Sequence, residues 1–139
     1  MAAAGDGGAE AGRVCVVVPH FKDEYWLSVG FGLMEEARET GTDVLMFEAG
    51  GYHSLQRQIE LLETCIAREA DAILLGAVSA DDPRLLLAVK RAARGIPVVA
   101  LVNEFRSPDL SGAVGVDWRE MGLVIGDYLS RRYPEGSPP

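Results

Sequence analysis

VCVVVP, residues 14–19, is an uninterrupted apolar run, mostly β-branched, that ends at a proline. Such a run is typical of a strand buried on both faces, as in a parallel sheet with helices on either side. The same kind of segment recurs along the chain, and the further predicted strands are residues 44–47, 72–78, 97–102 and 113–116.

Segments with helical spacing separate or follow most of these strands. The first begins at Asp23 and Glu24, acids that suit a helix N-terminus, and Gly41 suits its end. The remaining helices are predicted around Leu55, Ile59, Leu62 and Ile66, around Leu86, Val89, Lys90 and Ala93 after Pro83, and over residues 118–132. The alternation predicts an α/β fold, a three-layer Rossmann-like or flavodoxin-like single lobe with a five-stranded parallel sheet in the order 2-1-3-4-5.

Length and charge narrow the classes of protein. The 139 residues suit one domain, and an apolar share of 48% is enough for a hydrophobic core. Lys and Arg total 13 against 21 Asp and Glu, a net charge of −8. This balance argues against nucleic-acid binding, which needs a clustered positive field, and against a polybasic membrane anchor.

The two ends of the chain differ from the rest in composition. Residues 1–12 are mostly Ala, Gly and acids, without the basic and long apolar regions of a secretory signal. We expect them to be a disordered tail and not a signal peptide. Residues 134–139, PEGSPP, are rich in helix breakers and are expected to fray.

Two cysteines are present, Cys15 in the first predicted strand and Cys65 in the second predicted helix. Without a Cys-x-x-Cys motif, the common four-ligand zinc sites are excluded or nearly so. We expect two buried free thiols instead of a disulfide, which leaves the redox compartment open.

Ligands of open parallel sheets bind beyond the carboxyl ends of the strands. The segments that follow the predicted strands contain the acids Asp23, Glu24, Glu48, Asp81, Asp82, Glu104 and Asp117, against Lys22 and Arg106. They also contain Tyr25, Trp26, Tyr52 and Trp118. Aromatic faces in negative surroundings favour a small cationic or zwitterionic amine. For the two tryptophans a core role is equally open, and for most acids capping or solvation is the simpler explanation.

Motifs for catalysis or for a cofactor are not found. There is no GxxxxGK[ST] loop, and Gly30-Phe31-Gly32 lies inside a predicted helix and lacks the third glycine of a dinucleotide motif. No serine or cysteine has an obvious catalytic arrangement, so an enzyme is disfavoured and no cofactor is expected. His20, His53 and Glu48 could form a metal site, but we expect hydrogen-bonding roles for these histidines.

Several longer motifs are more specific than the general pattern. They are VCVVVPHFKDEYWLSVGFG (residues 14–32), EAGGY (residues 48–52), QIE (residues 58–60), ADAILLGAVS (residues 70–79) and IPVV (residues 96–99). Together they resemble the N-terminal lobe of the type I periplasmic binding proteins, over about residues 13–129. PHFKDEYW and EAGGY are most similar to the members that sense trimethylamine N-oxide.

The resemblance implies a non-catalytic periplasmic sensor that binds trimethylamine N-oxide, or a similar amine, and signals to a membrane histidine kinase. Tyr25, Trp26 and Tyr52 would line an aromatic cage, with Asp117 and Trp118 at the crossover. Residues 13–117 would form the N-terminal ligand-binding lobe. The helix over residues 118–133 would belong to a second lobe that this chain lacks, and could instead pair two copies in a homodimer.

A second class of function is an intracellular effector-binding or dimerisation module of the same fold, as in sugar-type repressors. Those proteins carry an N-terminal helix-turn-helix, which residues 1–12 cannot form, so direct DNA binding is not expected. An interaction-only module stays open, because exposed aromatic residues on half of a cleft make an adhesive surface.

Overall fold

A buried inner strand pairs with a neighbour on each side in the computed structural model, which describes residues 12–135. β1 (Arg13–Val18) pairs in parallel with β2 on one side and with β3 on the other. The other strands are β2 (Asp43–Glu48), β3 (Ala72–Leu75), β4 (Val98–Leu101) and β5 (Gly112–Val114). All pairs are parallel and the order is β2-β1-β3-β4-β5, which confirms the predicted topology. The predicted tails, residues 1–11 and 136–139, lie outside the described residues.

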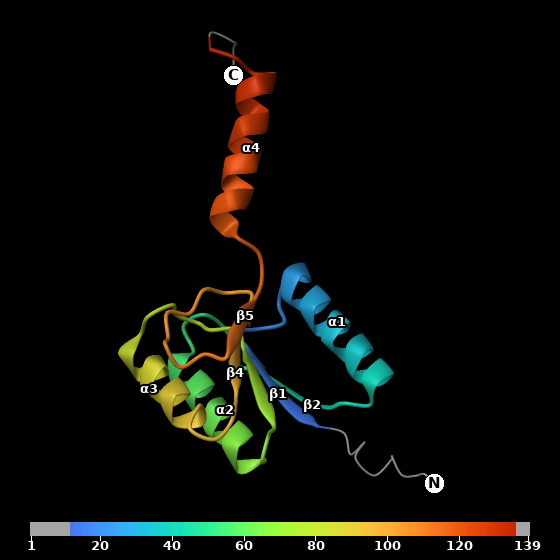
Figure 1. Cartoon of the computed structure of the whole chain (residues 1–139), viewed down its shortest axis with the longest axis vertical. Coiled ribbons are helices and arrows are strands. Elements are labelled where there is room, and N and C mark those ends of the chain that lie inside the picture. The colour runs from blue at the N-terminus through green and yellow to red at the C-terminus, as the bar shows by residue number, and fades with distance from the viewer. Residues whose placement is uncertain (1–11, 136–139) are drawn as a thin grey trace.

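Helices cover both faces of this sheet, so the predicted three-layer architecture is confirmed. α1 lies on one face, and α2 and α3 lie together on the other (Figure 1). The helices are α1 (Glu24–Thr40), α2 (Leu55–Ala67), α3 (Pro83–Ala92) and α4 (Trp118–Arg132). No helix connects β4 to β5, as the sequence predicts.

Helix ends follow from local chemistry. The Asp23 side chain accepts a hydrogen bond from the backbone N–H of Trp26 at 2.9 Å, and Gly41 ends α1 in the left-handed conformation with a φ of 72°. Asp82 caps α3 in the same way, with Pro83 in the first turn, where its missing N–H costs nothing. Ser54 stands at the start of α2 but its side chain makes no capping bond.

Each face of the sheet has its own core. Val16, Val18 and Leu101 pack with Trp26 on the α1 side, while the opposite face packs on α2 and α3. The buried residues of α2 are Gln58, Leu61, Leu62 and Cys65, and those of α3 are Leu85, Ala88, Val89 and Ala92. The buried stripes are thus displaced from the predicted ones by up to one residue, and Ile66 is exposed.

The expectation of free thiols is wrong, because Cys15 and Cys65 form a disulfide. Both residues are fully buried, and their Cα atoms lie 5.8 Å apart. The bond connects the inner strand β1 to α2 within the core of that face. Disulfides persist in oxidising compartments, so this finding bears on the redox question that the sequence left open.

β3 is shorter than predicted. Beyond its end, hydrogen bonds to a buried side-chain amide replace the missing pairing between strands. Gln58 on α2 is fully buried, and its Nε2 donates to the Gly76 carbonyl at 3.0 Å. Its Oε1 accepts from the Val78 N–H at 2.9 Å. One side chain therefore satisfies both backbone groups beyond the end of the strand and fixes the loop that follows.

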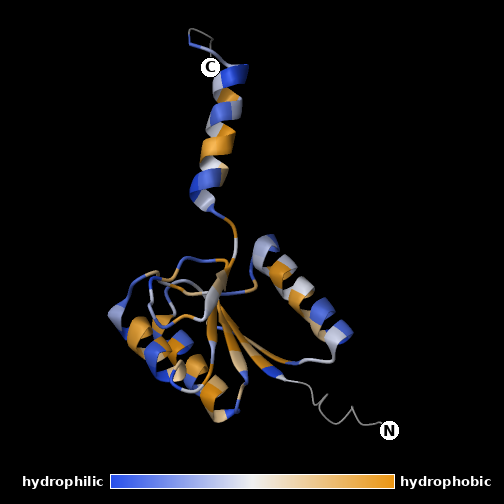
Figure 2. Ribbon diagram, viewed as in Figure 1, coloured by the Kyte–Doolittle hydropathy of each residue, from blue (hydrophilic) through white to orange (hydrophobic). Residues whose placement is uncertain are grey.

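α4 has no buried residue and extends away from the sheet (Figure 1). Apolar and polar residues alternate along it (Figure 2), and every residue of the helix is exposed. The exposed large apolar residues of α4 are Trp118, Met121, Leu123, Val124, Ile125, Tyr128 and Leu129. None of the helices within residues 12–135 has the length and apolarity needed to cross a bilayer.

Breaking the disulfide should destabilise the fold. The two cysteines are separated by 50 residues, and closing a loop of that length in the unfolded chain corresponds to about 4 kcal/mol in the chain-entropy picture. We expect a reductant to lower the free energy of unfolding, measured by urea denaturation, by up to about this amount. The double variant Cys15→Ala/Cys65→Ala should not respond to reductant. An unchanged midpoint for the native sequence would contradict the bond.

Replacing the buried amide should also destabilise the fold. Gln58→Leu keeps the size of the side chain but leaves the Gly76 carbonyl and the Val78 N–H without partners, at a cost of about 2–4 kcal/mol in unfolding free energy. Gln56→Leu on the exposed side of the same helix is the matched control and should change stability by less than about 0.5 kcal/mol. Equal effects of the two changes would show that the amide bridge is unimportant.

Candidate functional site

The carboxyl ends of the parallel strands meet at one edge of the sheet, and the side chains singled out in the sequence follow them. Trp26 is on the first turn of α1, after β1, and Tyr52 is in the loop after β2. Gly50 and Gly51 precede Tyr52 with φ values of 110° and 154°, a conformation that favours glycine. The Gly-Gly pair therefore lets the chain turn sharply and bring Tyr52 back over the sheet edge.

The Tyr52 hydroxyl is the centre of a small hydrogen-bond network. The indole Nε1 of Trp26 donates to it at 3.2 Å, and Nδ2 of Asn103 donates to it at 3.2 Å. The same Asn103 nitrogen donates to the Ala77 carbonyl at 2.9 Å. The edge of the His20 ring also packs on Tyr52, with centroids 5.5 Å apart and planes at 79°.

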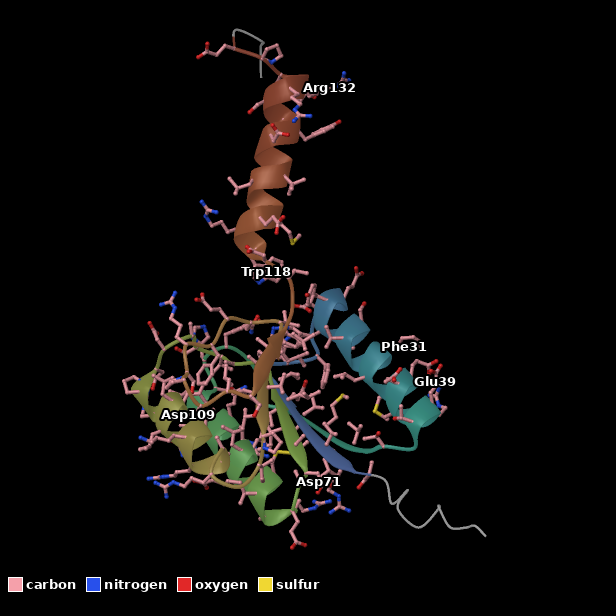
Figure 3. All side chains as sticks on the ribbon, in the orientation of Figure 1. Phe31, Glu39, Asp71, Asp109, Trp118 and Arg132 are labelled. Atoms are coloured by element: carbon pink, nitrogen blue, oxygen red, sulfur yellow. A yellow bond between two sulfur atoms is a disulfide. The ribbon has the colours of Figure 1, made fainter. Side chains whose placement is uncertain are left out.

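A series of neighbouring aromatic rings continues from the buried Trp26 to the base of α4. The rings of Tyr25 and Trp26 lie 6.2 Å apart, edge to face, and those of Tyr25 and Trp118 lie 6.1 Å apart. Trp118 stands at the start of α4, beside the N-terminal end of α1 (Figure 3). We call Tyr25, Tyr52 and Trp118 the aromatic rim; they are 45%, 45% and 49% exposed.

Trp26 differs from the aromatic rim because it is only 2% exposed. Its ring packs over Gly76, where a Cβ atom would lie 2.6 Å from the ring carbon Cη2. Pro19 closes the same spot, at 3.2 Å from that position. Trp26 is therefore a core residue that supports the site from beneath and holds Tyr52 by its N–H, which matches the core alternative that the sequence left open.

Asn103 is held by an unusual backbone turn. Val102 has a φ of 66°, and the Asn103 N–H donates to the Leu101 carbonyl at 2.7 Å, a three-residue γ-turn. A β-branched residue in this region is strained, at a cost of roughly 1–3 kcal/mol. The Val102 N–H is itself bound to the Val114 carbonyl at 2.7 Å, so pairing with β5 helps to hold the turn.

Most acids near this edge already serve the fold. Glu48 accepts from the Phe21 N–H at 2.7 Å, and Asp117 caps α4 by accepting from the Glu120 N–H at 2.9 Å. The Asp117 side chain therefore has a structural role beside the aromatic rim. Sequence reasoning placed it in the site, and the structure puts it next to Trp118 at the start of α4.

The basic residues of the edge partly offset the acids. Arg106 bonds Glu104 at 3.0 Å and Asp81 at 3.4 Å, and the Glu104 carboxylate raises the pKa of the Arg106 guanidinium. Arg84 bonds Asp82 and thereby lowers the pKa of that carboxyl. Acids still outnumber bases here. Among the described residues, 12–135, the side chains of Asp23, Glu24, Glu48 and Asp117 form no ion pair with Lys or Arg, and His20 lies 3.8 Å from Asp23.

The histidines do not gather around a common point. His20 Nδ1 accepts from the Lys22 N–H at 3.1 Å, and Glu48 is engaged with the Phe21 backbone. Within residues 12–135, no group of three or more His, Cys, Asp or Glu side chains is arranged to hold a metal ion.

A groove of about 400 Å³ runs from the end of β4 past β5 to the start of α4. Asn103, Phe105 and Trp118 are among its lining residues. The binding-site residues predicted from the sequence include neither Asn103 nor His20. The signal for Asn103 was its position directly after the fourth strand.

The chain is similar to known proteins in both sequence and fold. A family model described as periplasmic binding protein domain matches residues 14–137. The periplasmic protein TorT of Escherichia coli (strain K12) is 38% identical over 128 residues, which cover 92% of this chain and 36% of TorT. The chain therefore spans little more than a third of the length of that relative.

Two solved structures are similar in both fold and sequence. An ABC transporter solute binding protein from Bradyrhizobium sp. BTAi1, with bound bis-tris, has a TM-score of 0.82 and 40% identity over 93% of this chain and 38% of its own. The complex of the TorS sensor domain with TorT, in the presence of TMAO, gives a TM-score of 0.79 and 37% identity over 91% of this chain and 44% of the other.

The close contact between Trp26 and Gly76 should make the packing beneath the site sensitive to any side chain at residue 76. Gly76→Ala places a methyl group 2.6 Å from the indole, so the ring must move and we expect a loss of about 1–3 kcal/mol in unfolding free energy. In a Trp118→Phe background, the fluorescence of Trp26 should shift to the red as the ring becomes exposed. Gly95→Ala, where no atom lies within 4 Å, is the control. An unshifted spectrum would contradict the close packing.

Proposed function

The chain belongs to the periplasmic binding protein family, whose model matches residues 14–137, and on that basis we propose that it is a non-catalytic solute-binding lobe for a small methylated amine of the trimethylamine N-oxide class. The observation that carries this proposal is the aromatic rim, three residues about 45–49% exposed that follow the carboxyl ends of separate strands. The rings of Tyr25 and Trp118 lie 6.1 Å apart, and the Tyr52 hydroxyl is bonded to the indole of Trp26, the neighbour of Tyr25. Aromatic faces attract methylated ammonium groups through the ring quadrupole.

Charge supports the same class of ligand. The edge keeps an excess of carboxylates after Arg84 and Arg106 are paired, so the local field disfavours anions and favours cations or zwitterions. TMAO carries a positive nitrogen and a negative oxygen in one small molecule. Bis-tris, bound in the similar Bradyrhizobium protein, is also an amine.

The exposed α4 supports a division of the chain into two parts. We propose that residues 13–117 form the N-terminal ligand-binding lobe and that residues 118–133 belong to a second lobe, against which the apolar side chains of α4 would pack. A second lobe would also close over the aromatic rim and exclude water from the ligand. We do not propose a homodimer through α4, since the similar complex pairs TorT with a sensor domain.

The location and the partner are part of the proposal. A buried disulfide and periplasmic relatives support a place in the periplasm. The similarity to a TorS–TorT complex supports a membrane histidine kinase as the protein that reads the bound state.

An intracellular effector-binding module of the same fold is the alternative. The exposed apolar side chains of α4 favour an interaction surface in either case. The disulfide weighs against the alternative, because thiols are kept reduced in most intracellular compartments.

Truncating the aromatic rim should weaken ligand binding without unfolding the protein. We expect Tyr25→Ala and Tyr52→Ala each to raise the Kd for TMAO, measured by NMR titration, by at least about fivefold. Trp26→Ala is not a suitable test, because removing a side chain that is 2% exposed would damage the core. Tyr128→Ala, on the exposed surface of α4, is the matched control and should leave the Kd unchanged. Wild-type affinity in both rim variants would reject the aromatic site.

A further inference from the structure

The hydrogen bonds around Tyr52 determine what its hydroxyl can still do. A phenol oxygen accepts at its lone pairs and donates through one O–H. Trp26 Nε1 is a donor with no acceptor capacity, and it points at this oxygen from 3.2 Å. Asn103 Nδ2 points at the same oxygen from 3.2 Å. With two donors on its lone pairs, the hydroxyl has only its own hydrogen left to offer.

The orientation of the Asn103 amide is fixed by a second contact. The atom facing Tyr52 also lies 2.9 Å from the carbonyl oxygen of Ala77. An amide nitrogen fits there, since its two hydrogens serve the carbonyl and the hydroxyl, whereas an amide oxygen would face a carbonyl oxygen without a proton between them. Asn103 is therefore a donor to Tyr52.

The position of Asn103 depends on the strained turn before it. The γ-turn at Val102, with its φ of 66°, carries the chain from β4 to a point where the side chain reaches both Ala77 and Tyr52. Strain of this kind persists only where the surrounding structure holds it, and it clusters at functional sites. The turn therefore connects the pairing of β4 with β5 to the direction in which the Tyr52 hydroxyl donates its hydrogen bond.

We propose that Asn103 is a positioning residue that forces Tyr52 to act as a hydrogen-bond donor, so that the site selects amines with a strongly accepting oxygen on the nitrogen over amines without one. This inference rests on the proposed function, because it concerns the same aromatic rim. The rings attract the methylated nitrogen without regard to the oxygen. Tyr52 is 45% exposed as a residue, and its hydroxyl hydrogen supplies the contact that distinguishes an amine oxide from a tetraalkylammonium ion.

A pair of ligands with nearly the same shape tests this directly. In TMAO one of the four substituents on nitrogen is an oxygen, and in tetramethylammonium it is a methyl group. We expect the wild-type chain to bind TMAO about tenfold more tightly, the effect of one hydrogen bond to a charged oxygen. Kd values for both ligands are measured by NMR titration, and the ratio of the two is the readout.

Two variants alter the donor in different ways. Asn103→Leu removes the donor to Tyr52 without adding a charge beside the ligand, so the hydroxyl is no longer held as a donor to the ligand and the ratio should fall toward one. Tyr52→Phe removes the hydroxyl and keeps the ring, and it should lower the ratio to the same level while the Kd for tetramethylammonium stays within about twofold. Tyr128→Phe is the control and should keep the wild-type ratio.

The ratio of the two Kd values tests the role of Asn103, whereas binding of either ligand tests the proposed amine site. A merely structural role of Asn103 would weaken both ligands equally and leave the ratio unchanged, which would overturn the inference. A wild-type chain that binds both ligands without preference would also overturn it, while the amine site would stand. A wild-type chain that binds neither ligand would reject the proposed function and this inference with it. If Asn103→Leu does not fold, Asn103→Ala, which also removes the donor to Tyr52, is measured in its place, and an unchanged ratio there would overturn the inference.

Discussion

The packing of Trp26 over Gly76 is the constraint on which both the fold and the site depend. The indole fills the space between α1 and the sheet, where Val16, Val18 and Leu101 surround it. The absence of a side chain at residue 76 allows the ring to lie against the backbone. The indole N–H donates to the Tyr52 hydroxyl at the end of this core. Trp26 therefore fills a hydrophobic layer and also takes part in a polar network.

The loops at the sheet edge are held by side chains and not by the strand ladder. Gln58 continues the pairing beyond β3, and Asn103 bridges the loops that follow β2, β3 and β4 through Tyr52 and Ala77. These contacts are short-range and specific, so the loops have a defined shape although they lie outside regular structure. A rigid edge of this kind lowers the entropy lost when a small ligand is bound.

The sequence was sufficient to predict the topology because the strands are apolar runs and most connections have helical spacing. Both patterns can be recognised without knowing how the elements pack. It was less informative about which residues of a helix face inward. In α3, three consecutive leucines leave the phase ambiguous, and the structure buries Leu85 in preference to Leu86 and Leu87. The disulfide was missed since pairing depends on how β1 and α2 approach, over a separation of 50 residues. The role of Asn103 depends on a positive φ at Val102, a conformation that a valine argues against.

The disulfide has a consequence for maturation. It joins β1, which leads to Trp26, to α2, whose first residue comes three positions after Tyr52. The two partners of the indole–hydroxyl bond are thus carried by the two segments that the cysteines connect. A newly made chain with reduced thiols lacks this covalent link between the two segments, so oxidation should restrict how far Trp26 and Tyr52 can move apart.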